Sequence, residues 1–228
     1  MLERIEISRD IAASPEQVYP GIKLMLEPDL YEGQAWVGLI PFSMQNLRLP
    51  GPFSALTKLL RVRDFGEVNV RTYVKGPDGK TGVWFCTLDS DDWLAVKTAN
   101  IAFGLPYRIA KTRFEQTHET MNWTSERKSD LAKVELVVRK TVGLSRDAEP
   151  GLEQFLVERY ALYTLRRGKL LRGRLEHERW KVKNASLEHV VHETVDSEGI
   201  IVSSGAHVLI GEPVEVTVYP LRRVRELG

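Results

Sequence analysis

The chain has 228 residues, of which 43% are hydrophobic, so it is long enough for one domain with a large core. Its 32 basic and 31 acidic residues leave a formal charge of +1, which argues against nucleic acid or a membrane as a partner. Cys86 is the only cysteine, so an internal disulfide is excluded and a cytoplasmic location is expected. The sequence shows no secretion signal and no stretch as long as a membrane span, and we expect one domain over residues 1–228.

The first quarter of the chain predicts two strands, a helix start and a loop. Residues 4–11 alternate apolar and charged side chains, as a half-buried strand does. Ser-Pro-Glu-Gln at residues 14–17 has the pattern of a capping box with proline at the first helical position. Residues 33–44 form an apolar run that predicts a buried strand bending at Pro41, and residues 47–53 predict a loop rich in turns.

A hairpin and a helix follow. Residues 65–74 and 83–89 predict two strands joined by a tight turn, because Pro-Asp-Gly at residues 77–79 lies between them. Residues 90–104 predict a helix that has Ser90 as its N-cap and ends at a glycine.

The second half of the chain consists mostly of predicted strands. We predict strands at residues 107–117, 120–126, 133–141, 155–165, 170–182 and 211–224, a hairpin turn at 166–169 and a short helix at 186–195. Many strands with two or three short helices indicate an α+β, mainly antiparallel β architecture. The order lacks βαβ alternation and a glycine-rich phosphate loop, which argues against a dinucleotide-binding or P-loop enzyme.

The strand at residues 65–74 has two contrasting faces. Because a strand has a period of two, Glu67, Asn69, Arg71 and Tyr73 share one face, and the opposite face is mostly valine. Buried charges need partners, so the polar face is a structural network, a solvated surface or the wall of a ligand pocket.

Several blocks of the chain resemble the YqjF-like family of uncharacterised bacterial proteins. The blocks run in family order from Trp36 to about Val224 and include GQAWVGLIPFSM, FGEVNVRTYV, GVWFCTLDSDDWLAV, AFGLPYRIA, FLVERYALY, GRLEHERW and VTVYPLRRV. The first 30 residues match poorly, and His-Glu-Arg-Trp at residues 177–180 has arginine where the family has proline. The resemblance places the chain in the acetoacetate-decarboxylase-like superfamily. It implies a closed or nearly closed antiparallel β-barrel with a few short peripheral helices and an inner cavity.

The same resemblance implies where a site lies. The decarboxylases have an aromatic residue, a proline and two adjacent lysines, and the matching segment here is Leu-Pro-Tyr-Arg at residues 105–108. Tyr107 stands at the position of the Schiff-base lysine, and a phenol cannot form an imine, whereas Arg108 keeps the neighbouring cation. Glu67 matches the decarboxylase glutamate, which implies that its face points into the barrel while the valine face packs outward against helices.

Both residues of this segment have a structural alternative. Tyr107 is a candidate hydrogen-bond donor to a developing oxyanion, or a core tyrosine with a satisfied hydroxyl. Arg108 is a candidate for fork-like binding of a carboxylate or phosphate, or a member of a structural salt bridge.

Two further residues are candidates on the predicted strands at 155–165 and 170–182. Glu158 is expected on the same face as Tyr160 and would be a second acid/base group beside Glu67, or part of a cross-strand ion pair. His177 titrates near neutral pH and is a candidate for moving protons or binding a ligand, although a lone strand histidine is more often structural.

The lysines and the other histidines carry weaker signals. Lys111 would replace the missing nucleophile only if its strand projects it inward, and Lys97 lies in the predicted helix. His189 and His192 would share a helical face, but a zinc site needs a third defined ligand, so we expect no metal.

Two hypotheses remain open. In the first, the barrel binds a small anionic molecule with Asn69, Arg71, Tyr73, Arg108 and His177, and Glu67, Glu158 and Tyr107 perform acid/base or lyase-type chemistry on a carbonyl or carboxylate compound. In the second, the protein is a non-catalytic binding or interaction module whose polar interior is structural. We expect no cofactor in either case, and self-association is left open.

Overall fold

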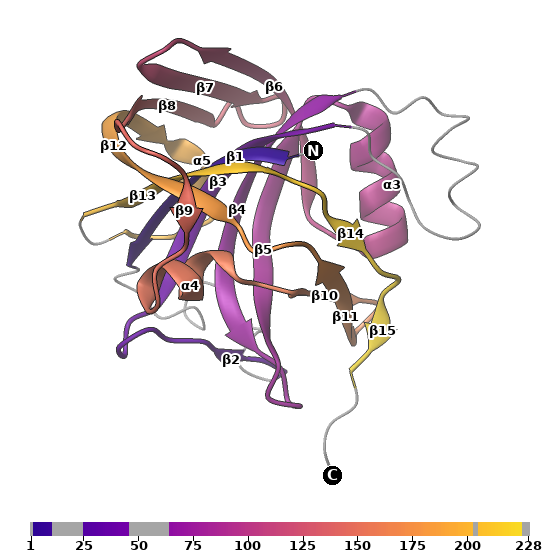
Figure 1. Ribbon diagram of the computed structural model, residues 1–228. Helices are drawn as coiled ribbons and strands as arrows, with labels where there is room; N and C mark the ends of the chain where they lie inside the picture. Colours follow the sequence, from indigo (N-terminus) through magenta and orange to yellow (C-terminus); the bar gives the residue numbers. More distant parts are fainter. Residues whose placement is uncertain (1, 11–24, 46–63, 203–204, 225–228) are drawn as a thin grey trace.

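The computed structural model describes residues 2–10, 25–45, 64–202 and 205–224, with the side chains of 2–10 excepted. The described residues form fifteen strands in one sheet and three short helices (Figure 1). The strands are β1 (Leu2–Asp10), β2 (Glu27–Pro28), β3 (Trp36–Met44), β4 (Phe65–Lys75), β5 (Thr81–Ser90), β6 (Tyr107–Gln116), β7 (Thr120–Arg127), β8 (Lys133–Lys140), β9 (Arg146–Asp147), β10 (Ala161–Arg166), β11 (Lys169–Glu176), β12 (Lys181–His192), β13 (His207–Val214), β14 (Thr217–Val218) and β15 (Arg222–Arg223). The helices are α3 (Trp93–Phe103), α4 (Leu152–Val157) and α5 (Glu193–Asp196).

The strand-rich, mainly antiparallel architecture with few helices is confirmed. The strands follow the order β14-β11-β10-β5-β6-β7-β8-β12-β13-β1-β3-β4-β2, so the sheet as a whole is not closed and ends at β14 and β2. A further pairing of β5 with β4 links the two arms of this order. Only β5 with β6 and β5 with β10 are parallel among the described pairs. None of the described helices has the length and apolar character needed to cross a bilayer.

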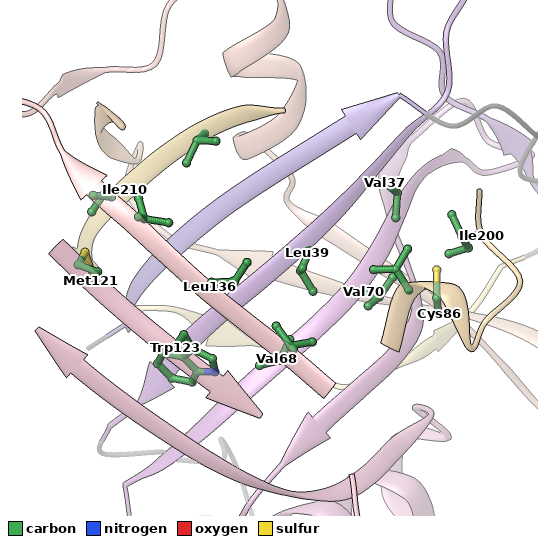
Figure 2. Packing of buried hydrophobic residues seen from close by; sticks show 14 residues of the cluster. Val37, Leu39, Val68, Val70, Cys86, Met121, Trp123, Leu136, Ile200 and Ile210 are labelled. Atoms are coloured by element: carbon green, nitrogen blue, oxygen red, sulfur yellow. The ribbon is translucent and has the colours of Figure 1, made fainter. Parts of the chain in front are cut away.

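The valine face of β4 forms part of the main hydrophobic core. Val68 and Val70 are fully buried and belong to one cluster with Leu39 of β3, Trp123 of β7 and Leu136 of β8 (Figure 2). Strands of opposite arms of the sheet thus meet across this core. The expectation that the valine face packs outward against helices is wrong, because the covering residues come mostly from other strands.

The polar face of β4 is buried as well. We call Glu67, Asn69, Arg71 and Tyr73 the polar column; their exposed fractions are 2%, 4%, 7% and 1%. Tyr73 belongs to a second hydrophobic cluster, which includes Leu156 of α4 and Leu162 of β10. The polar column is therefore neither a solvated surface nor part of the core that β7 and β8 build.

Local turn and cap chemistry explains several confirmed elements. The β4–β5 turn uses Gly79 at φ 74°, and the β10–β11 turn uses Arg167 and Gly168 at φ 51° and 70°. Helix α3 ends at Gly104, which has left-handed backbone angles. Its N-cap is Asp92 and not Ser90, because the Asp92 carboxylate accepts the first free amides of the helix.

Four predicted elements differ from the structure. The strand predicted at 211–224 is divided among the end of β13, β14 and β15. The strand predicted at 155–165 begins only at Ala161, because residues 152–157 form α4, whose apolar residues recur at helical spacing. The strand predicted at 170–182 is interrupted between Glu176 and Lys181. The helix predicted at 186–195 is mostly strand: β12 continues to His192 because it pairs with β8 along this stretch.

Pro41 does not end the strand in which it lies. Strand β3 continues through Pro41, which lies opposite Val68 of β4. The predictions for residues 14–17 and 47–53 lie outside the described residues.

Candidate functional site

The centre of the candidate site is a contact between a carboxyl group and a phenol. The Tyr107 hydroxyl donates a hydrogen bond of 2.7 Å to Oε2 of Glu67. Glu67 comes from β4, and Tyr107 is the first residue of β6, directly after the turn that ends α3. Strand β5 lies between them and pairs with both strands, which places the two side chains on one face of the sheet.

The environment of Glu67 strongly favours its neutral form. Burial raises the pKa of Glu67 to about 8, and the nearby Asp89 charge adds to the rise, against hydrogen bonds from Tyr107 and Asn69 that lower the pKa. Burial and the Glu67 carboxylate together raise the pKa of Tyr107 well above its ordinary value of 10.0. At neutral pH, Glu67 is therefore mostly a carboxylic acid and Tyr107 a neutral phenol. Each group keeps its own proton, and the pair carries no net charge.

Asn69 lies next to Glu67 between two aliphatic side chains. Its register partners are Ile40 of β3 and Leu88 of β5, both about 1% exposed. One end of the Asn69 amide contacts Glu67, whereas Oδ1 is buried and has no hydrogen-bond partner among the described residues. Turning the amide over would only exchange which end contacts Glu67. A buried amide end without a partner costs about 1–3 kcal/mol, so this position favours a polar guest.

The other end of the polar column meets helix α4. Nη2 of Arg71 donates a hydrogen bond of 3.0 Å to the carbonyl of Leu156, near the C-terminus of the helix. The Arg71 guanidinium also lies 5.6 Å from the ring centre of Tyr73. A helix C-terminus carries a partial negative charge, so this contact suits a buried cation.

Arg159 also reaches Tyr73 and was not predicted. Its guanidinium lies 4.8 Å from the Tyr73 ring centre and 4.2 Å from that of Phe155, and it forms an ion pair of 2.5 Å with Asp29. Alternation along the strand predicted at 155–165 would put Arg159 on the face opposite Glu158, but residues 158–160 lie between α4 and β10 and form no strand.

Glu158 and His177 lie together around Tyr160. Glu158 follows the end of α4 and accepts hydrogen bonds from the Trp180 amide and the Tyr160 hydroxyl. The His177 ring stacks on Tyr160 with ring centres 4.6 Å apart. In the part of the chain that the structure describes, no interaction joins Glu158 to Glu67, so the predicted pair of acid/base carboxylates is not formed.

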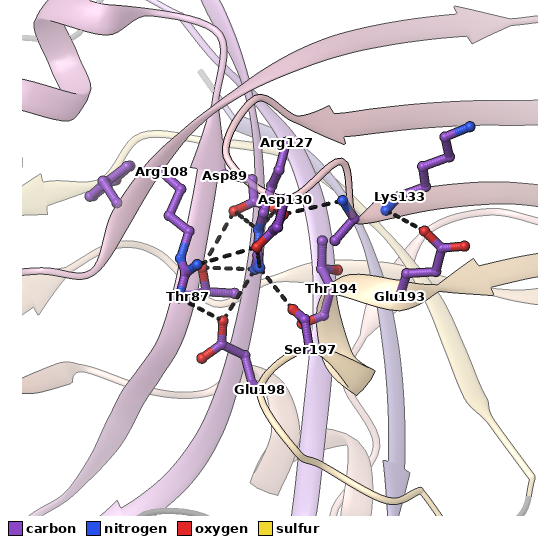
Figure 3. A network of polar contacts seen from close by, with 12 residues as sticks. Thr87, Asp89, Arg108, Arg127, Asp130, Lys133, Glu193, Thr194, Ser197 and Glu198 are labelled. Atoms are coloured by element: carbon purple, nitrogen blue, oxygen red, sulfur yellow. Dashed lines mark hydrogen bonds and ion pairs between the residues drawn. The ribbon is translucent and has the colours of Figure 1, made fainter.

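Arg108 faces the opposite side of the sheet from Tyr107 and joins a different set of charges. It lies 3.4 Å from Asp130 and 3.2 Å from Glu198, both of which also contact Arg127 (Figure 3). The contacts of Arg108 are therefore those of a structural salt bridge, and its guanidinium does not join the polar column.

Arg127 is the centre of this network and was missed. It is fully buried, and its Nε donates to both carboxylate oxygens of Asp89 at 2.8 and 2.9 Å, while its other nitrogens reach Thr87 and Ser197 (Figure 3). Burial raises the pKa of Asp89, and the Arg127 guanidinium opposes this rise. The alternation of residues 120–127 was a usable signal, because it puts Arg127 on the same face as the buried Trp123.

The lysines and the remaining histidines lie outside the site. Lys97 and Lys111 are exposed, so neither projects into the buried polar column. His189 and His192 are on a strand and not on a helix, where they pair with Glu135 and Asp196 at 3.7 and 3.2 Å. Among the described residues no cluster of three or more metal-ligating side chains occurs.

The sequence of the chain matches a known protein family. A family model, DUF2071, described as an uncharacterized conserved protein, matches residues 12–215. The uncharacterized protein YqjF of Bacillus subtilis (strain 168) is 35% identical over 201 residues, which cover 87% of this chain and 81% of YqjF.

Solved structures share the fold at low sequence identity. Acetoacetate decarboxylase from Legionella pneumophila matches with a TM-score of 0.64 at 13% identity, over 99% of this chain and 88% of that one. The enduracididine biosynthesis enzyme MppR, complexed with the condensation product of pyruvate and imidazole 4-carboxaldehyde, matches at 0.66 and 12%, over 100% and 88%. The same enzyme complexed with pyruvate matches at 0.60 and 12%, over 100% and 90%. The chain therefore belongs to the DUF2071 family and has an acetoacetate-decarboxylase-like fold.

Proposed function

We propose that this protein binds a small anionic organic molecule at the polar column, and that Glu67 and Tyr107 serve it as an acid/base pair without a Schiff base. The observation that carries the proposal is the buried Glu67 carboxyl group, which has a pKa of about 8 and a hydrogen bond of 2.7 Å from Tyr107. Carboxyl groups with raised pKa values in sheltered positions are typical of catalytic acids and bases.

The protonation state of Glu67 decides which role it takes. Below about pH 8 the carboxylic acid is the main form, so Glu67 donates a proton, and above that pH its carboxylate accepts one. In a lyase-type step, the bond between the carbon next to a carbonyl and a leaving group breaks, and the leaving group departs without the electron pair, as carbon dioxide does. The pair stays on the substrate as an enolate, to which Glu67 gives its proton. The Tyr107 hydroxyl then stabilises the carboxylate that results.

The rest of the polar column supplies recognition. Asn69 offers the end of its amide that has no partner, and Arg71 places a buried cation further along the strand. A ligand with a carboxylate for Arg71 and a hydroxyl group that donates to the Asn69 oxygen matches this order of groups. We assign no part in the chemistry to Glu158 or His177. Among the described residues their contacts are with Tyr160 and Trp180 and not with the polar column.

The relatives with solved structures support a small ligand of this class. One is an acetoacetate decarboxylase, and another was solved in complex with pyruvate. Tyr107 in place of a lysine argues against imine chemistry in this chain. We further propose that the β4–β5 pairing makes the central strands a barrel and that the protein works in the cytoplasm.

A structural role for the polar column is the competing hypothesis. Its support is that Glu67 and Tyr107 bond to each other and that Arg71 bonds to the Leu156 carbonyl. Buried polar groups that satisfy one another can fix a fold without any ligand.

Ligand capture separates the two hypotheses. The purified protein, incubated with a mixture of small keto acids and hydroxy acids, is examined by native mass spectrometry beside Glu67→Gln and Glu126→Gln. Glu126 is an exposed residue of β7 that lies 3.6 Å from Lys133, so its variant is the matched control. We expect the wild type and the control to retain a small molecule and Glu67→Gln to lose at least tenfold in occupancy. Equal capture by all three proteins would support the structural hypothesis.

A further inference from the structure

The backbone of Tyr107 is held by a side chain of α3. Oδ1 of Asn100 accepts a hydrogen bond of 2.9 Å from the Tyr107 amide, and its Nδ2 donates one of 3.1 Å to the Tyr107 carbonyl. The backbone carbonyl of Asn100 also accepts the Gly104 amide, which closes the end of α3. A single exposed asparagine thus links the helix end to the residue whose hydroxyl contacts Glu67.

The place of Tyr107 in the sheet explains why it needs this support. Strand β6 begins at Tyr107, and its parallel pairing with β5 extends over only three residue pairs. The Leu88 amide bonds to the Pro106 carbonyl, so the backbone groups of Tyr107 point away from β5. The Tyr107 amide lies 2.9 Å from the Leu105 carbonyl as well as from Asn100, whereas its carbonyl accepts from Asn100. Without Asn100, the Tyr107 amide would keep the Leu105 carbonyl, but both hydrogen bonds that join the Tyr107 backbone to α3 would be lost.

We propose that Asn100 is a positioning residue, which holds Tyr107 so that its hydroxyl reaches Glu67. The proposal deepens the proposed function, because it names a residue outside the polar column on which the acid/base pair depends. Asn100 acts through the backbone of Tyr107 and touches neither the ligand nor Glu67. A purely structural role would affect the stability of α3 and leave the protonation of Glu67 as it is.

The titration of Glu67 distinguishes these roles without any ligand. Protein labelled with ¹³C at the glutamate carboxyl groups is titrated by NMR, and the Glu67 signal is assigned by its loss in Glu67→Gln. The other groups that act on Glu67 are Asn69 on its own strand and Asp89 on β5, and both are kept in every titrated variant.

The expected result is a rise in the pKa of Glu67 when the hydrogen bond from Tyr107 is lost. Tyr107→Phe should raise it by about half to one pH unit, the value of one hydrogen bond. Asn100→Ala should give at least half of that rise, and Asn100→Ala in the Tyr107→Phe background should add nothing further. Lys97→Ala, an exposed residue one turn earlier on α3, is the control and should leave the titration unchanged.

Two results would overturn the proposal. One is a pKa of Glu67 in Asn100→Ala that equals the wild-type pKa. The other is a double variant in which Asn100→Ala raises the pKa of Glu67 above that of Tyr107→Phe by as much as it does in the wild type. Asn100→Gln keeps the amide but displaces it by one methylene group, so it gives the same comparison if the alanine variant folds poorly. Because no ligand is present, a failure of ligand capture at the polar column leaves this result untouched.

Discussion

Tyr107 and Arg108 are neighbours in the chain, yet they face opposite sides of the same sheet. Tyr107 lies opposite Leu88 in the β5–β6 register and reaches Glu67, whereas Arg108 lies opposite Asp89 and reaches Asp130. The turn after α3 therefore serves two separate polar clusters. A phenol contacts the buried acid on one face, and a guanidinium joins an ion-pair network on the other.

The raised pKa of Glu67 predicts a pH dependence of stability. The folded protein holds this proton up to about pH 8, whereas an unfolded chain releases it near the ordinary value of 4.5, so the free energy of unfolding falls as pH rises through this window. Glu67→Gln cannot ionise and should not show this fall. Its stability relative to the wild type should increase by about 1.4 kcal/mol per pH unit between pH 5 and 8.

Urea denaturation at several pH values measures this difference. Glu126→Gln on the exposed face of β7 is the control and should follow the wild type at every pH. A constant difference between Glu67→Gln and the wild type from pH 4 to 9 would show that Glu67 ionises in the folded protein as it does in water.

The pair of Arg127 and Asp89 should be essential for stability. Both side chains are fully buried, so Arg127→Ala leaves the Asp89 carboxylate without its main partner, and we expect a loss of about 3–5 kcal/mol. Arg139→Ala is the matched control, because Arg139 is an exposed side chain that pairs with Glu119 and Glu188, and its loss should cost less than about 1 kcal/mol. Urea denaturation measures both variants, and equal losses would contradict the central role of the buried pair.

The sequence predicted which side chains share a face of a strand better than it predicted which elements pack on that face. A period of two separates Glu67 from Val68 without knowledge of the fold, and both faces of β4 have the predicted side chains. Which face meets other strands depends on the order of the sheet, and the wrong expectation about the valine face arose there. The resemblance to a family supplied Tyr107 and its partner Glu67, which are 40 residues apart.

The remaining errors have two physical origins. Short segments with apolar residues fit either a strand or a helix, so the local pattern predicts a strand at residues 155–157 and a helix at 186–192. Packing makes the first segment a part of α4, and pairing with β8 makes the second a strand. Long-range polar pairs leave no local trace: Arg127 and Asp89 are 38 residues apart and meet only because β6 lies between β5 and β7. The contact of Arg159 with Tyr73 is also long-range, and it forms because the chain turns between α4 and β10.

Trapping of an imine tests the loss of Schiff-base chemistry. Tyr107 replaces the nucleophile, and Lys97 and Lys111 are exposed, so incubation with acetoacetate and borohydride should leave the intact mass unchanged. An acetoacetate decarboxylase treated in the same way is the positive control. A specific adduct on Lys111, located by peptide mapping, would contradict the assignment of a mechanism without an imine.

Gly38 gives a way to crowd the polar column without removing any of its groups. A methyl group at Gly38 would lie 3.2 Å from the Tyr73 hydroxyl and 3.5 Å from Cγ of Arg71, both on the face that Gly38 shares across the β3–β4 register. Such contacts are tight, so Gly38→Ala should displace both side chains slightly and lower ligand capture about tenfold, equal to about 1.4 kcal/mol.

Gly173→Ala is the matched control for this experiment. Its added methyl group would meet Leu221 and Leu162 at 3.1 and 3.3 Å, a similar degree of crowding in apolar surroundings on β11. Both variants should lose about 1–3 kcal/mol of stability, but only Gly38→Ala should lose capture of a small carboxylate in native mass spectrometry. Parallel losses of capture in the two variants would mean that general destabilisation, and not the position of Arg71 and Tyr73, governs binding.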